Sequence, residues 1–165
     1  MVNILEVPLI ATIRRNHAVE HATIHVLTQR NPRRHLMGRT TARGFYLFGE
    51  VETEEVAAAV SEALARLRGG EHDLAVHPRC GTNLAAAGVL AGLSTFVVMS
   101  RHSKSRLAKL PQAILAATLA VIAAQPLGLA LQKHVTTLPD VEGVTIEGIT
   151  RQKQGQIVVH RIDLG

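Results

Sequence analysis

The hydrophobic pattern is dominated by two long uncharged runs, residues 80–100 and 110–132, in which most side chains are small or apolar. Each run exceeds the roughly 18 residues that mark a transmembrane candidate. The alternative is a pair of buried core helices, but a domain of this size could hardly cover two helices that are apolar all round. We therefore predict two membrane spans, at about residues 82–100 and 111–131, joined by a short basic loop at residues 101–109.

Shorter periodic segments flank these runs on both sides. Helical spacing predicts one helix at residues 5–29, stopped by Asn31-Pro32, and a second at residues 53–68, where Thr53 would cap the start. Alternation and turn residues predict five short strands: 36–40, 45–48, 74–76, 144–150 and 156–162. The last two would form a hairpin that extends the sheet begun near residue 36. The expected fold class is an α+β soluble domain of two helices and a small antiparallel sheet, with a two-helix transmembrane hairpin.

This pattern predicts that the chain has three parts. Residues 1–80 form the α+β domain, residues 81–132 the transmembrane hairpin, and residues 133–165 the terminal β-hairpin that joins the soluble domain. The counts of Lys and Arg on the two sides of the spans are equal, so the positive-inside rule does not decide the orientation. Residues 1–20 carry no pattern of a cleaved signal peptide. We expect an integral protein of the inner or cell membrane whose soluble domain is cytoplasmic.

Composition narrows the range of partners. The chain has 18 Lys+Arg and 13 Asp+Glu, yet residues 1–80 are nearly neutral, with ten Arg, no Lys and nine acids. It contains no Trp, one Tyr and three Phe. A nucleic-acid groove needs a broad basic face with aromatic platforms, so we expect no nucleic-acid partner. The single cysteine, Cys80, excludes an internal disulfide.

His17, Glu20 and His21 stand close together in the first predicted helix. At about 100° and 1.5 Å per residue, His17 and His21 lie one turn apart on one face, with Glu20 beside them. Two imidazoles at this spacing can bind a divalent metal, and an adjacent carboxylate can serve as general base. The order His-x-x-Glu-His is the inverted zinc-protease motif, although helix histidines are more often ordinary surface or core residues. His17 and His21 are therefore candidate ligands of Zn²⁺ or another divalent transition metal, and Glu20 is a candidate catalytic residue.

A second set of ligand-type residues, His77 and Cys80, stands on a Pro-containing turn directly before the first predicted span. Both residue types bind zinc well. Two helix histidines plus one ligand from this turn would leave a fourth coordination position open, as in catalytic zinc sites. The alternative for Cys80 is a small buried residue at the membrane interface. Both roles stay open at this point.

Four more residues are weaker candidates for the site. His25 lies about 12 Å along the helix axis from His17, so one metal cannot bind both; His25 could contact a ligand, bind a second metal or only line the site. Glu50 could supply a carboxylate ligand, although its position fits a turn equally well. Thr82 and Asn83, at the start of the first span, could present backbone N–H groups to a developing oxyanion.

These motifs resemble a known family. His17-Ala18-Val19-Glu20-His21 and His25, together with His77-Pro78-Arg79-Cys80-Gly81-Thr82-Asn83, are similar to the core motifs of the YqhQ-like bacterial membrane proteins. The segment 49–56, and the segment 128–132 with Thr136-Thr137 and Pro139-Asp140, resemble the matching parts of that family. The resemblance implies a predicted metal-dependent membrane enzyme whose substrate is not settled. The pentad alone is also similar to the insulin-degrading and pitrilysin-type proteases, without their size or fold.

The function we expect is a small membrane-anchored zinc hydrolase, a peptidase or amidase that acts on a peptide or small-molecule substrate at the membrane surface. The alternative is a non-catalytic, metal-stabilised scaffold or sensor module, in which His77 and Cys80 both bind the metal and close the site. A third interpretation is a purely polar histidine network between helix and sheet. The sequence leaves the metal, the substrate and the formation of a homo-oligomer open.

Overall fold

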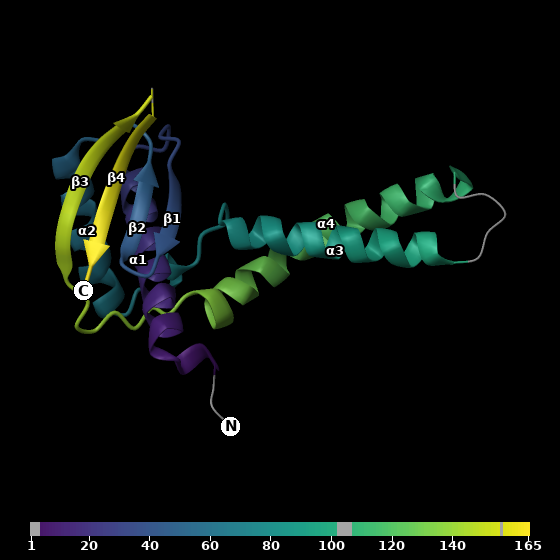
Figure 1. Cartoon of the computed structure of the whole chain (residues 1–165), viewed down its shortest axis with the longest axis horizontal. Helices are drawn as coiled ribbons and strands as arrows, with labels where there is room; N and C mark the ends of the chain where they lie inside the picture. Colours follow the sequence, from purple (N-terminus) through teal and green to yellow (C-terminus); the bar gives the residue numbers. More distant parts are fainter. Residues whose placement is uncertain (1–3, 102–106, 156) are drawn as a thin grey trace. The chain divides into compact units, whose positions relative to one another are not determined.

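The computed structural model describes residues 4–101, 107–155 and 157–165, and the chain divides into two compact units (Figure 1). The first unit comprises Met1–His77 and Lys133–Gly165, and the second comprises Pro78–Gln132. Within the described residues the fold has four α-helices and a four-stranded antiparallel sheet, and two of the helices are long and apolar enough to cross a membrane. The predicted α+β fold class is confirmed.

Two helices of the first unit pack against its sheet. A 3₁₀ turn, η1 (Ile4–Glu6), precedes α1 (Pro8–Arg30), and α2 is Thr53–Arg68. Pro8 suits the first turn of α1, where a missing N–H removes no hydrogen bond. α1 packs on α2 and on the first two strands, while α2 packs on the third strand. The buried residues of α2 recur every three or four positions: Val56, Ala59, Val60, Ala63, Leu64 and Leu67.

The sheet combines strands from both ends of the chain. Its strands are β1 (Met37–Thr41), β2 (Gly44–Phe48), β3 (Ile146–Gln154) and β4 (Ile157–Leu164), in the order β1-β2-β4-β3. Every neighbouring pair is antiparallel, and β4 lies beside β2, with Leu47 opposite His160. The prediction that the terminal hairpin extends the first sheet is therefore confirmed. The pairing of β2 with β4 joins the segment before the apolar helices to the segment after them.

Two local predictions are wrong. Residues 74–76 form no strand: the backbone makes a 3₁₀ turn, η2 (His72–Ala75), with Leu74 N–H donating to the Glu71 carbonyl at 3.1 Å. The carbonyls of Ala75 and Val76 accept hydrogen bonds from histidine rings of α1 instead of from a neighbouring strand. Thr53 does not cap α2, because the capping position is Glu52.

The second unit is a pair of packed apolar helices, α3 (Gly81–Ser100) and α4 (Leu110–Leu131), with a 3₁₀ turn, η3 (Leu107–Lys109), before α4. Most of the predicted basic loop, residues 102–106, lies outside the described residues. At the other end of the pair the Gln132 amide donates to Asn83 Oδ1 at 2.7 Å, and the Asn83 amide donates to the Pro78 carbonyl at 2.8 Å. Gly128 makes this contact possible, because a Cβ there would overlap Asn83.

Candidate metal centre

The candidate site lies on the second half of α1, which is the most enclosed helical segment of the first unit. From Asn16 to Leu27 nearly every side chain is buried, because α2, the sheet and η2 surround this part of the helix. Glu20 is 5% exposed and His21 is 2% exposed. Polar side chains at this depth need hydrogen-bond partners, and those partners fix their orientation.

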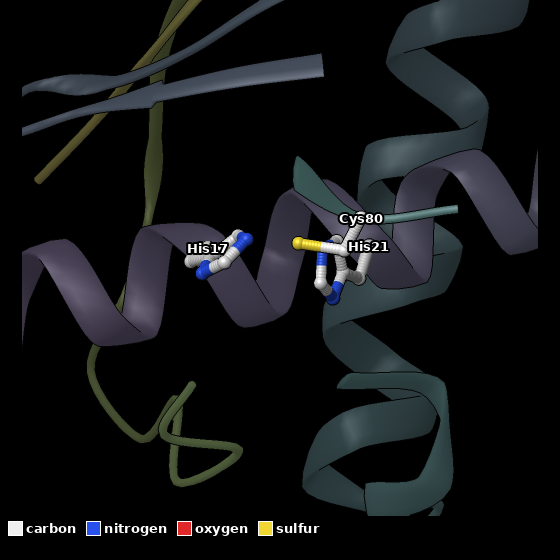
Figure 2. A group of neighbouring side chains, drawn as sticks. All are labelled: His17, His21 and Cys80. Atoms are coloured by element: carbon white, nitrogen blue, oxygen red, sulfur yellow. The ribbon is translucent and has the colours of Figure 1, made fainter. Parts of the chain in front are cut away.

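His17 and His21 form a pair with matching hydrogen bonds. Their ring centroids are 4.2 Å apart, one helical turn along α1 (Figure 2). His17 Nδ1 lies 2.9 Å from the Thr136 carbonyl, and His21 Nδ1 lies 2.7 Å from the Ala75 carbonyl. A carbonyl only accepts, so Nδ1 carries the proton in both rings, and Nε2 is the nitrogen that each ring in its neutral form would offer to a metal. Metal-binding histidines typically have this arrangement, in which a backbone carbonyl fixes the tautomer and orients the ring.

Two more histidine rings, those of His77 and His25, lie close to the ring of His21 or to one another. The His77 ring lies 5.8 Å from that of His21 and 4.8 Å from that of His25, centroid to centroid. His25 makes the opposite hydrogen bond, because its Nε2 lies 2.9 Å from the carbonyl of Val76, directly before His77. His21 and His25 thus hold the Ala75–Val76 segment against α1.

Cys80 is tied to this group by the chain itself. It follows His77 by three residues, so the two stay within about 10 Å of one another at full extension. The ligand set predicted from the sequence adds the Cys80 thiol to the imidazoles of His17 and His21. The Cys80 sulfur also accepts a hydrogen bond from the Thr82 N–H at 3.4 Å, which caps the start of α3. Two imidazoles and a thiol are a donor set that suits zinc.

Glu20 points from α1 towards the first strand of the sheet. Its carboxylate accepts a hydrogen bond from the Thr40 hydroxyl. Gly38 lies beside it, and a Cβ at position 38 would overlap the carboxylate. Burial raises the pKa of Glu20, while the Thr40 hydrogen bond and the nearby His17 act in the opposite direction. A raised carboxyl pKa suits a general base that must work near neutral pH.

Gly38 and Thr40 were not among the residues singled out from the sequence. Residues two apart on a strand face the same side, so the predicted strand at 36–40 places both on one face. A glycine within a strand often marks close approach of another group. That signal was available, but the sequence does not say which residue approaches.

Three weaker candidates lie elsewhere or are already engaged. Glu50 lines a surface pocket of about 570 Å³ together with Arg34, Glu55 and Arg151. The backbone N–H groups of Thr82 and Asn83 donate to the sulfur and the carbonyl of Cys80, respectively. The predicted oxyanion donors are therefore occupied by a helix cap, and we assign them no catalytic role.

Comparison with known proteins places the chain in a family. Residues 12–149 match the family described as a domain of unknown function, DUF6391. The chain belongs to this family. The DUF6391 match includes the histidines of α1, the turn at His77–Cys80 and both apolar helices.

A curated relative comes from Picosynechococcus sp. and is described as an uncharacterized protein. It is 41% identical over 139 residues, which is 76% of this chain and 65% of the relative. This chain therefore spans 65% of the relative's length. No solved structure matches the chain. Neither description mentions the YqhQ-like proteins or the inverted-motif zinc proteases, so both resemblances stay predictions.

Proposed function

We propose that this DUF6391 chain is a membrane-anchored, metal-dependent hydrolase that acts on a peptide or amide substrate at the membrane surface, with zinc as its metal. The observation that carries the proposal is the shared tautomer of His17 and His21. Both rings donate Nδ1–H to a backbone carbonyl, so the neutral form of each would present the lone pair of Nε2 to a metal, one helical turn apart.

The ligand set would combine these histidines with the turn before α3. Nε2 of His17 and of His21 would bind the metal, with either His77 or Cys80 as the third ligand. Three protein ligands leave one position open, which is the usual arrangement of catalytic zinc sites. When bound, zinc would supply a Lewis acid that brings the pKa of water to about 7.

Glu20 would act as the general base. Its buried carboxylate, held by Thr40, would accept the proton of the attacking water and return it to the leaving amine. Two observations support this role: burial raises the Glu20 pKa, and His17 is near enough to influence it. Gly38 supports it further by leaving room for the carboxylate.

The membrane anchor would be the α3–α4 pair, with the first unit in the cytoplasm. Large apolar side chains on both helices are exposed, including Leu84 of α3 at 74% and Ile114 of α4 at 65%. A lipid environment would cover such side chains, whereas water would not. Together with helix length, this supports an integral protein of the cell membrane.

Metal analysis of the purified full-length protein tests the proposal. We expect about one zinc per chain in wild type, a large loss in the variant His17→Ala, His21→Ala, and no loss in the control His35→Ala, which removes an exposed histidine. Wild type without metal after purification in the presence of zinc would overturn the proposal. So would a double variant that keeps the wild-type content.

The second candidate is a non-catalytic scaffold or sensor whose metal is fully enclosed by protein ligands. One observation favours it: the Glu20 carboxylate already has a structural partner in Thr40. Glu20→Gln separates the two, because glutamine can still accept from Thr40 but cannot take a proton. The hydrolase would lose turnover and keep its metal, whereas the scaffold would change little in either respect.

A further inference from the structure

The start of the first unit carries an apolar surface that its core does not use. Ile4 is 67% exposed and Leu9 is 60% exposed, whereas the second half of the same helix is almost completely buried. Ile13, on the same face as Leu9 one turn later, is 37% exposed, and Val135 is 38% exposed. We call these four residues the N-terminal apolar patch.

Arg14 holds the two parts of this patch together. Its guanidinium donates to the Leu5 carbonyl at 3.2 Å, and to the carbonyls of His134 and Thr137 at 3.3 and 3.1 Å. In addition, the N–H of Leu138 donates to the Arg14 carbonyl at 3.0 Å. Residues 4–14 and 133–138 therefore form one continuous part of the first unit.

The covalent chain limits how far this part can lie from the end of α4 when α4 spans a bilayer. α4 ends at Leu131, and Val135 follows four residues later. Four residues reach at most about 14 Å, so Val135 stays near the membrane surface at which α4 ends. The contacts of Arg14 then bring Leu9 and Ile13 to the same surface.

Charge near the patch suits lipid headgroups. The exposed Lys133 precedes Val135 by two residues, the Arg14 guanidinium joins the two parts of the patch, and one acidic residue, the exposed Glu6, lies in η1. Short apolar helical faces bordered by basic residues are typical of segments that lie in the interfacial layer of a membrane.

We propose that the N-terminal apolar patch inserts into the interfacial layer of the bilayer that α4 spans, as a second attachment of the first unit to the membrane. The occupant is the lipid surface. The inference rests on the membrane anchor of the proposed function and does not depend on the metal. Such an attachment would hold the α1 histidines at a fixed depth below the headgroups.

Tryptophan fluorescence tests the proposal, because the natural chain contains no Trp. Leu9→Trp and Ile13→Trp each place one probe in the patch of the full-length protein. Ile157→Trp is the matched control, since Ile157 is also apolar and 55% exposed but begins β4 at the opposite end of the first unit (Figure 1). Each variant is reconstituted into vesicles of phosphatidylcholine, with or without bromine on the acyl chains, and with added anionic phosphatidylglycerol.

We expect blue-shifted emission and quenching by brominated lipid at positions 9 and 13, and neither effect at position 157. Emission at position 9 like that of a water-exposed indole overturns the proposal. A blue shift without quenching by bromine also overturns it, because protein and not lipid then covers the indole.

An alkaline carbonate wash separates failure of this inference from failure of the anchor. Protein that resists the wash but shows no quenching refutes the patch alone. Protein that the wash removes refutes the anchor and the patch together. Zinc content, measured on the same samples, reports independently on the metal.

Discussion

Thr40→Val removes the one described hydrogen bond to the buried Glu20 carboxylate while keeping a β-branched side chain in strand β1. A hydrogen bond to a charged group contributes about 1.5–3 kcal/mol, and a carboxylate left buried without its donor loses at least that much. For a protein of this length each kcal/mol corresponds to about 2–4 °C in melting temperature, so we expect a decrease of about 3–12 °C.

The assay is thermal unfolding of the full-length protein in detergent, followed by circular dichroism. Thr150→Val is the matched control, because it makes the same change at an exposed position of strand β3. We expect the control to stay within about 0.5 kcal/mol of wild type.

A second test asks whether the cost of Thr40→Val depends on the charge of Glu20. In a Glu20→Gln background the hydrogen bond is neutral on both sides, so Thr40→Val should then cost only about 0.5–1.5 kcal/mol. Equal costs of Thr40→Val in the two backgrounds, or a cost no larger than that of Thr150→Val, would refute the idea that Thr40 stabilises an ionised, buried carboxylate.

Three further predictions concern other parts of the chain. Burial lowers the pKa of His160 from its usual 6.5. The stability that the neutral ring contributes is therefore present above pH 6.5 and is lost as the pH falls through the lower pKa of the folded state. His160→Leu should flatten the decline in melting temperature between about pH 7 and 5. Asn83→Ala removes the bonds to Gln132 and Pro78 and should cost about 1–3 kcal/mol, whereas Thr118→Ala, which loses only a bond to its own helix, should cost less. A chelator should lower the melting temperature of wild type but not that of the variant His17→Ala, His21→Ala, because a ligand that binds only the folded state stabilises it. An unchanged pH profile in His160→Leu, equal costs of the two alanine variants, or equal chelator effects would contradict the respective prediction.

The elements with a strong period could be predicted from the sequence. Helix α2 ends at Arg68 as predicted, because the following Gly69-Gly70 gives a clear stop signal, and it begins one residue before the predicted start, at Thr53 itself. The two apolar helices were equally clear, since their length and composition exceed what a small core can cover.

Segments whose hydrogen bonds depend on distant side chains could not be predicted. Residues 74–76 have a strand-like composition, but the rings of His21 and His25 take the carbonyls that a neighbouring strand would need. The ring tautomers of His17 and His21 are equally beyond the sequence, because they depend on carbonyls 119 and 54 residues away. Spacing on a helix selects candidate ligands, but only the fold shows which nitrogen each one presents.

The most direct test of the metal centre is anomalous diffraction from crystals grown with zinc, recorded on both sides of the zinc absorption edge. We predict an anomalous peak about 2.1 Å from Nε2 of both His17 and His21, with a third contact to Cys80 or His77. A zinc peak that avoids both histidines, or no peak in crystals supplied with the metal, would contradict it.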